Sequence, residues 1–284
     1  MSRLSESQHQ AGDVSSGEAG RLVEAVDQPT EAGNKLGEVQ ATTQKRGPGA
    51  AIRSYVLRRS HFSGAQRDAY QRLMPVFGVP FSSSPFDLPV LFGRSAETIL
   101  EIGFGMGDTT AEIAAADPAR NYLAVDVHTP GIGALLKLLE ARRITNVRIV
   151  EHDAREVVDQ QIPDASLTGV HVFFPDPWPK ARHHKRRLIQ KQFVAALATK
   201  LRPGGYLHLA TDWPDYAEQM LEAVDSTPLL RRFPCDAASL DGKSGDKVTG
   251  TPSRASGLRP ETRFEKRGRA LGHPITDILA GRLC

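Results

Sequence analysis

Residues 98–107 have the sequence Thr-Ile-Leu-Glu-Ile-Gly-Phe-Gly-Met-Gly, a short apolar run that leads directly into three alternating glycines. A run of this length that ends at glycine is typical of a buried strand, and the glycines permit a tight turn and a close approach of the backbone to a ligand. Thr109 and Glu112 then form a capping-box signature, which predicts a helix that ends before Pro118. The sequence therefore predicts a strand, a glycine turn and a helix in succession.

The same alternation continues along the chain. Further strands are predicted over residues 121–126, 147–151, 169–174 and 206–211, and helices after Thr129-Pro130 and over residues 188–201, with a turn at 202–205. Strands that alternate with helices imply a parallel sheet that is covered on both faces. We therefore predict an α/β fold with a Rossmann-like, doubly wound and mostly parallel sheet.

Two segments differ in composition from this core. Residues 1–50 contain no aromatic residue and no isoleucine, so they cannot bury enough apolar surface to offset the entropy of ordering. Residues 241–257 have a single large apolar side chain, Val248, among glycine, serine, proline and lysine. We expect a disordered N-terminal tail over residues 1–50, one catalytic domain over 51–284, and a mobile loop at about 241–257.

The composition excludes several classes of protein. Of the 284 residues, 40% are hydrophobic, but no apolar run approaches the roughly 20 residues that a membrane-spanning helix needs. The first ten residues lack the apolar core of a targeting peptide. Cys235 and Cys284 are the only cysteines, too few and too far apart for a zinc site or a disulfide framework. We expect a cytoplasmic protein with no membrane segment and no metal.

An acidic residue accompanies every predicted strand. Glu101 lies within the first strand, and the others are followed by Asp126, Asp153, Asp176 and Asp212. Any one of them could be a helix cap or a turn former. However, the carboxyl ends of parallel strands share one edge of the sheet, where ligands bind. Five acids in succession therefore favour a ligand site that is lined by carboxylates.

A dinucleotide site is the obvious competitor for the glycine turn, because Asp126 lies about 20 residues further on, where a ribose-binding acid is expected. The sixth position of that fingerprint is Asp108, whose charge would oppose a pyrophosphate. S-adenosylmethionine has no phosphate and carries a sulfonium cation, which suits carboxylates. The turn thus favours S-adenosylmethionine, with an NAD-dependent oxidoreductase as the alternative.

A run of cations follows the fourth predicted strand. Residues 173–180 have the sequence Phe-Phe-Pro-Asp-Pro-Trp-Pro-Lys, and residues 181–187 have Ala-Arg-His-His-Lys-Arg-Arg. An isolated charged run is often only a solvated helix face. Because this run lies directly beside Asp176, we predict that it contacts a nucleic-acid backbone. The predicted contacts are Arg182, Lys185, Arg186 and Arg187.

Five segments resemble the bacterial tRNA (guanine-N(7)-)-methyltransferases. They are residues 100–107 (LEIGFGMG), 127–131 (VHTPG), 173–180 (FFPDPWPK), 210–213 (ATDW) and 259–268 (RPETRFEKRG). The resemblance covers about residues 52–279. It implies the class I S-adenosylmethionine-dependent methyltransferase fold, S-adenosylmethionine as the cofactor, and methylation of nitrogen 7 of the guanine at tRNA position 46, in the variable loop.

The resemblance also implies roles for individual residues. It implies a cofactor pocket lined by Glu101, Gly103, Gly105, Asp126, Asp153 and Asp176, with Asp176 as the active-site carboxylate. It implies tRNA contacts at Lys180, Asp212, Thr262, Arg263, Phe264 and Glu265. The chain departs from the family pattern at Asp126, where glutamate is usual, and at Arg263, where lysine is frequent.

The chemistry of this reaction asks little of acid–base catalysis. Nitrogen 7 of guanine has a free lone pair and no proton to lose, so positioning should dominate. We expect Asp176 to hold the guanine and to offset the positive charge that the purine gains; a role as a base stays open. Two further alternatives are an RNA-binding protein that keeps this fold without activity, and a methyltransferase that acts on an amino group of a base. We expect tRNA as partner without an accessory subunit, in a monomer or a homodimer.

Overall fold

A computed structural model describes residues 54–55, 61–233 and 259–283. The predicted tail over residues 1–50 and the predicted loop over 241–257 lie outside the described residues. Within the described part of the chain, no helix combines the length and the apolar character that crossing a bilayer requires.

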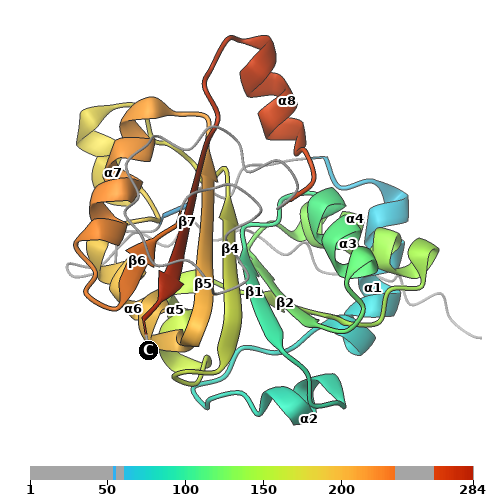
Figure 1. Cartoon of the computed structure of the whole chain (residues 1–284). Coiled ribbons are helices and arrows are strands. Elements are labelled where there is room, and N and C mark those ends of the chain that lie inside the picture. The colour runs from blue at the N-terminus through green and yellow to red at the C-terminus, as the bar shows by residue number, and fades with distance from the viewer. Residues whose placement is uncertain (1–53, 56–60, 234–258, 284) are drawn as a thin grey trace, which may run out of the picture. The chain divides into compact units, whose positions relative to one another are not determined.

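One seven-stranded sheet forms the centre of the domain (Figure 1), with the strand order β3-β2-β1-β4-β5-β7-β6. The strands are β1 (Thr98–Ile102), β2 (Asn121–Asp126), β3 (Val147–Glu151), β4 (Leu167–Phe173), β5 (Leu201–Thr211), β6 (Leu230–Arg232) and β7 (Thr276–Arg282). Strands β1 to β5 run parallel to one another, whereas β7 is antiparallel to both β5 and β6. The predicted α/β fold with a mostly parallel sheet is confirmed.

The order of the strands reverses between β1 and β4. From β1 the chain proceeds outward to β2 and β3, and then returns to place β4 on the other side of β1. In open α/β sheets, ligands bind outside the carboxyl ends of the strands at such a switch point. The topology therefore directs attention to the glycine turn after β1 and to the segment that leaves β4.

Two layers of helices cover the sheet and divide the core. One layer contains α1 (Gly64–Phe77), α3 (Asp108–Ala116) and α4 (Thr129–Arg142); the other contains α5 (Ala154–Gln160), α6 (Lys191–Lys200) and α7 (Pro214–Asp225). Side chains alternate between the layers, so Ile99 packs with the first, and Leu100 and Ile102 with the second. The short helices α2 (Leu88–Phe92), η1 (Ala181–Arg186) and α8 (Arg263–Ala270) complete the described elements.

Three local predictions need correction. Thr109 and Glu112 do not form a capping box: α3 begins at Asp108 after Gly107, which has a φ of 77° and caps the helix without a side chain. A Cβ at Gly107 would lie 2.6 Å from Cβ of Leu135, so the absence of a side chain lets the turn pack against α4. The predicted turn at residues 202–205 is part of β5, which begins at Leu201. The predicted helix over 188–201 covers only Lys191–Lys200.

Candidate functional site

The turn after β1 has an unusual backbone conformation. Gly103 and Gly105 have φ values of 76° and 60°, in the left-handed region that favours glycine. Apart from its chain neighbours, no atom of the described residues lies within 4 Å of the position that a Cβ on Gly103 would occupy. At Gly105 the nearest such atom is Cε2 of Phe264, at 4.0 Å. The turn therefore presents open backbone to a ligand, with Phe264 across from it.

Asp126, at the end of β2, fixes this turn. Its Oδ2 accepts a hydrogen bond from the Gly105 amide at 2.9 Å. Its Oδ1 accepts from the amides of Val127 and His128 at 2.7 and 3.0 Å. Burial raises the pKa of Asp126, and the three backbone hydrogen bonds oppose that shift. The carboxylate thus joins the ends of β1 and β2, and Oδ2, which accepts one hydrogen bond, has a second lone pair for a ligand.

Glu101, in β1, is deeply buried beside the glycine turn, with 3% of its surface exposed. Burial raises its pKa to about 7; the Thr110 side chain opposes the shift, and the charge of Asp126 adds to it. Within the described residues, Oε2 of Glu101 has no hydrogen-bond partner. A buried carboxylate oxygen without a partner is costly in a folded protein. Its presence beside an open glycine turn indicates a site for a ligand that carries hydrogen-bond donors or positive charge.

The end of β3 contributes Asp153 and a contact that the sequence analysis missed. Asp153 caps α5, since its Oδ1 accepts from the Arg155 amide at 2.9 Å. Glu151 accepts two hydrogen bonds of 2.5 Å, from the hydroxyls of Tyr70 and Thr129. These contacts attach α1 and α4 to the rim of the site. No local sequence signal announces this contact, because Tyr70 lies 81 positions before Glu151.

The segment that leaves β4 is held in a strained conformation. Phe174 and Trp178 have φ values of 53° and 46°, which are rare for side chains of this size. The Phe174 amide donates to the Ala210 carbonyl at 2.8 Å, and the Trp178 indole donates to the Ser54 carbonyl at 3.1 Å. Asp176 lies between these two anchored residues and is exposed. The segment thus presents the predicted active-site carboxylate at the switch point of the sheet.

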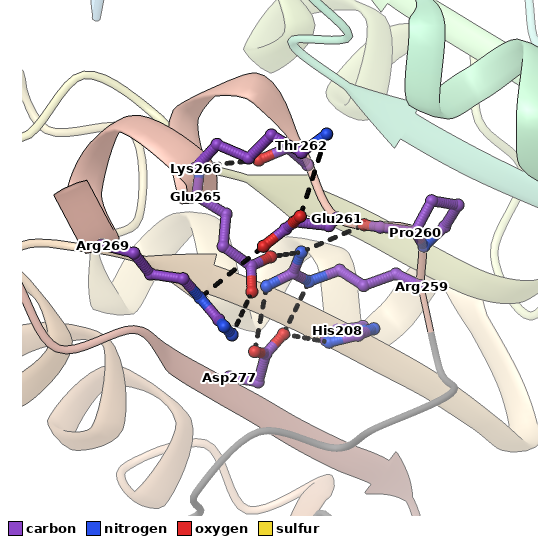
Figure 2. A network of polar contacts seen from close by, with 9 residues as sticks. All are labelled: His208, Arg259, Pro260, Glu261, Thr262, Glu265, Lys266, Arg269 and Asp277. Carbon is purple, nitrogen blue, oxygen red and sulfur yellow. Dashed lines mark hydrogen bonds and ion pairs between the residues drawn. The ribbon is translucent and has the colours of Figure 1, made fainter.

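A network of polar contacts attaches α8 to the sheet (Figure 2). Arg259 donates to Glu265 of α8 and to both carboxylate oxygens of Asp277 in β7. Arg269 donates to the other oxygen of Glu265 at 2.7 Å, and His208 of β5 contacts Asp277 at 2.8 Å. Burial would raise the pKa of Asp277, but the hydrogen bonds with His208 and Arg259 outweigh it and lower the pKa. The network holds α8 beside the carboxyl end of β5.

Four predicted tRNA contacts lie in or next to α8, and the structure divides them into two pairs. Phe264 is 57% exposed and stacks on Phe174, with ring centroids 6.4 Å apart. Arg263 contacts Asp108 of α3 at 3.2 Å. These two side chains face the glycine turn and the exit of β4.

Thr262 and Glu265 have internal roles instead. The Thr262 hydroxyl caps α8 by accepting from the Glu265 amide at 3.0 Å. The Glu265 side chain is 1% exposed and binds two arginines. The contacts that the structure shows for these two side chains are therefore internal ones, within the network in Figure 2, and their contact with the substrate stays a prediction.

The basic run after β4 is also divided. The side chains of Lys180, Arg182 and Lys185 are exposed, and the guanidinium of Arg186 lies 4.0 Å from the centroid of the Trp178 ring. Partial burial and the neighbouring cations lower the pKa of His183, as expected where positive charge is concentrated. Trp178 packs against this run and is half-buried.

Arg187 corrects the prediction that this whole run binds RNA. Its side chain is 1% exposed. The guanidinium donates to the Pro177 carbonyl at 2.8 Å, to Gln219 at 2.8 Å and to Asp215. It also lies over the ring of Tyr216, 4.8 Å from the centroid. A guanidinium with these partners is not available to a phosphate, so Arg187 anchors the run to α7.

Asp212, at the end of β5, faces α8. Its Oδ2 lies 3.7 Å from Nδ1 of His273, and a Cβ on Gly268 would lie 3.0 Å from this oxygen. Gly268 therefore permits α8 to approach Asp212 closely. Of the predicted site residues, Asp212 thus lies beside the α8 segment, whereas Glu101 and Asp126 surround the glycine turn.

The residues at the glycine turn fit S-adenosylmethionine. Its sulfonium and ammonium groups are cationic, and the unpartnered Oε2 of Glu101 is a suitable acceptor. The open space at Gly103 allows close contact with the backbone. In the described ranges, no cluster of three or more histidine, cysteine or acidic side chains could hold a metal ion. Fold and site together define a Rossmann-like α/β methyltransferase.

Comparisons with known proteins identify the family. The family described as "Putative methyltransferase" matches residues 95–278. A tRNA (guanine-N(7)-)-methyltransferase from Nitrosospira multiformis is 51% identical over 232 residues, which cover 82% of this chain and 95% of the relative. The protein with that name from Bordetella pertussis is 52% identical over 83% of this chain and 87% of its own length. This chain belongs to the tRNA (guanine-N(7)-)-methyltransferase family. Membership excludes the NAD-dependent alternative.

Proposed function

We propose that this chain transfers a methyl group from S-adenosylmethionine to nitrogen 7 of a guanine in tRNA, at position 46 of the variable loop. Membership in the family supports the reaction. The single observation that carries the proposal in the structure is the unpartnered, buried oxygen of Glu101 beneath the open glycine turn. Asp176 is exposed at the neighbouring strand end, on the other side of the switch point.

Glu101 and Asp126 would hold the methyl donor, and Gly103 and Gly105 would let it approach the backbone. When bound, S-adenosylmethionine supplies an electrophilic methyl group on a sulfonium. Glu101 would accept hydrogen bonds from the ammonium group of the cofactor, and the remaining lone pair of Asp126 Oδ2 would accept from a hydroxyl. Asp153 retains one oxygen beside its capping bond and would complete this rim.

Asp176 would act on the purine by electrostatics. As the bond from nitrogen 7 to the methyl carbon forms, the carbon–sulfur bond breaks and the purine gains the positive charge. No proton has to leave the ring nitrogen, so the carboxylate is needed as a fixed negative charge and not as a base. Its position between the anchored residues Phe174 and Trp178 suits this role, because a rigid carboxylate reorganises little during the reaction.

The tRNA would be held on both sides of Asp176. The exposed cations Lys180, Arg182 and Lys185 would contact phosphates on one side. Arg186 would supply further positive charge while it covers one face of Trp178. Arg263, Phe264 and Asp212 would contact the substrate on the other side. We further propose that the protein acts in the cytoplasm without an accessory subunit, as a monomer or a homodimer.

The test is to map the methylated atom. An unmodified tRNA transcript with guanine at position 46 is incubated with the protein and S-adenosylmethionine, and 7-methylguanine is detected by cleavage of the chain at the modified site. We expect one cleavage at position 46, and none in a transcript with adenine at that position. Asp176→Asn should lower kcat by about 10² to 10³-fold and retain cofactor binding.

Other outcomes would contradict the proposal in recognisable ways. Binding of tRNA without any methyl transfer would indicate an inactive RNA-binding protein. Methylation of an exocyclic amino group would indicate a different reaction at the same site. Normal turnover by Asp176→Asn would remove the role that we give to this carboxylate.

A further inference from the structure

Arg259 connects three elements of the site from a buried position. Its side chain is 4% exposed. Nη1 donates to Oε2 of Glu265 in α8 at 2.6 Å, while Nε and Nη2 donate to the two oxygens of Asp277 in β7 at 2.8 and 3.0 Å (Figure 2). All three nitrogens of the guanidinium therefore have carboxylate partners, and these partners come from two different elements.

The third element is the exit of β4. The guanidinium carbon of Arg259 lies 5.4 Å from the ring centroid of Phe173 and 5.2 Å from that of Phe174. Contacts of this kind between a guanidinium and aromatic rings are attractive. Phe174 has a φ of 53° and precedes Asp176 by two positions. The side chain that binds α8 thus also packs on the segment that carries the active-site carboxylate.

The geometry of these contacts requires arginine. The flat, forked guanidinium binds Asp277 with two nitrogens, Glu265 with the third, and the two rings with its face. A lysine ammonium is a point charge and cannot make this set of contacts. A lysine would keep the positive charge between the two buried carboxylates and would change only the geometry.

We propose that Arg259 is a positioning residue for methyl transfer. It fixes α8, which carries Arg263 and Phe264, relative to the Phe174–Asp176 segment, so that the purine is held in line with the methyl donor. Arg259 does not itself touch the substrate, because its guanidinium is enclosed by the network. This inference rests on the proposed function, and it adds a residue that acts through the placement of others.

The test compares Arg259→Lys with the wild-type protein in tRNA methylation, below the melting temperatures of both. Misplacement of reacting groups by about 1 Å can cost about 10²-fold in rate, so we expect kcat to fall by about 10- to 100-fold. The Kd for S-adenosylmethionine should stay within about twofold, because the glycine turn is unchanged. The Kd for tRNA should stay within about threefold, because the basic run after β4 is intact.

Arg232→Lys is the matched control. Arg232 lies in β6 and pairs with Asp225 at 2.6 Å, in a partly exposed ion pair outside the site. The same chemical change there should leave kcat unaltered. A folded Arg259→Lys protein with wild-type kcat would overturn the proposal. Failure of the proposed function would be distinct, because the wild-type protein would then transfer no methyl group to nitrogen 7.

A second variant keeps the proposal testable if Arg259→Lys does not fold. Asp277→Asn preserves the size of the side chain and the pair between Arg259 and Glu265, but weakens the hydrogen bonds between Arg259 and β7. We expect kcat to fall by at least about threefold, with cofactor affinity unchanged. A folded Asp277→Asn protein with normal kcat would overturn the proposal.

Discussion

Two pairs of carboxylates lie at the carboxyl edge of the sheet, and they differ in what surrounds them. Glu101 and Asp126, at the glycine turn, pair with no lysine or arginine in the described part of the chain. Glu265 and Asp277, in the α8–β7 corner, bind Arg259, and Glu265 also binds Arg269. The first group has the capacity to bind a cationic ligand. The second group is neutralised inside the protein.

The partners of a carboxylate indicate better than its residue type whether it binds a ligand or stabilises the fold. Burial raises the pKa of Glu101 to about 7, whereas the hydrogen bonds around Asp277 overcome burial and lower its pKa. A carboxylate that is destabilised in the folded protein gains most from a ligand with positive charge. A carboxylate that already has arginine partners gains little, and its loss should affect stability more than binding.

The cations after β4 also divide into a buried, paired side chain and exposed ones. Replacing the buried one should have the largest effect on stability. Arg187→Ala removes a buried guanidinium with three partners, so we expect the free energy of unfolding to fall by about 3 kcal/mol. Urea denaturation measures this change. Lys185→Ala, on an exposed side chain, should change stability by less than about 0.5 kcal/mol. It should instead flatten the log–log salt dependence of tRNA binding by about 0.7 to 0.9. The reverse pattern would contradict the assignment.

The pH dependence of stability tests whether the buried negative charge of Glu101 destabilises the folded protein. The unfolded chain releases this proton near pH 4.5 and the folded chain near pH 7. The folded state therefore binds more protons in this window, and stability is lost as the pH rises through it. The expected loss is roughly 3 kcal/mol or less for the protein without cofactor. Urea denaturation at about pH 5 and pH 8 should show a smaller loss for Glu101→Gln than for the wild type. Equal losses of stability in the two proteins would show that the charge of Glu101 does not destabilise the folded state.

Glu265→Gln tests the other half of the comparison. The change keeps the size of the side chain and removes the charge that two arginines share, so we expect a loss of about 2 kcal/mol in the free energy of unfolding. The Kd for S-adenosylmethionine, measured by isothermal titration calorimetry, should change by less than about twofold. If cofactor binding weakened strongly while stability stayed constant, the division between the two groups of carboxylates would be wrong.

The sequence was sufficient to predict the parallel core of the fold. The runs at residues 98–102 and 121–126 are apolar and short, and the helix after Thr129 has its apolar residues at helical spacing, so local patterns indicate these elements. The gathering of acids at one edge follows from the parallel arrangement alone. The glycine run that follows residues 98–102 likewise indicates the turn between β1 and α3 from the sequence alone.

Local pattern could not indicate which charged residues are buried. Arg187 and Lys185 are two positions apart in one basic run, yet Arg187 is buried because Asp215, Gln219 and Tyr216 approach it from α7. Glu265 depends in the same way on Arg259, which also binds Asp277 in the next strand. Such partners are brought together by the tertiary structure, so the periodicity and composition of the sequence do not indicate them.

The most direct test of the account is the affinity of Glu101→Gln for S-adenosylmethionine, measured by isothermal titration calorimetry at about pH 8. The substitution preserves the shape of the side chain and removes the charge that has no partner in the described structure. We predict that Kd rises by about 10- to 100-fold, as expected for the loss of charged hydrogen bonds, while the protein without cofactor is at least as stable as the wild type. An unchanged Kd in the folded variant would contradict the claim that this carboxylate holds the methyl donor.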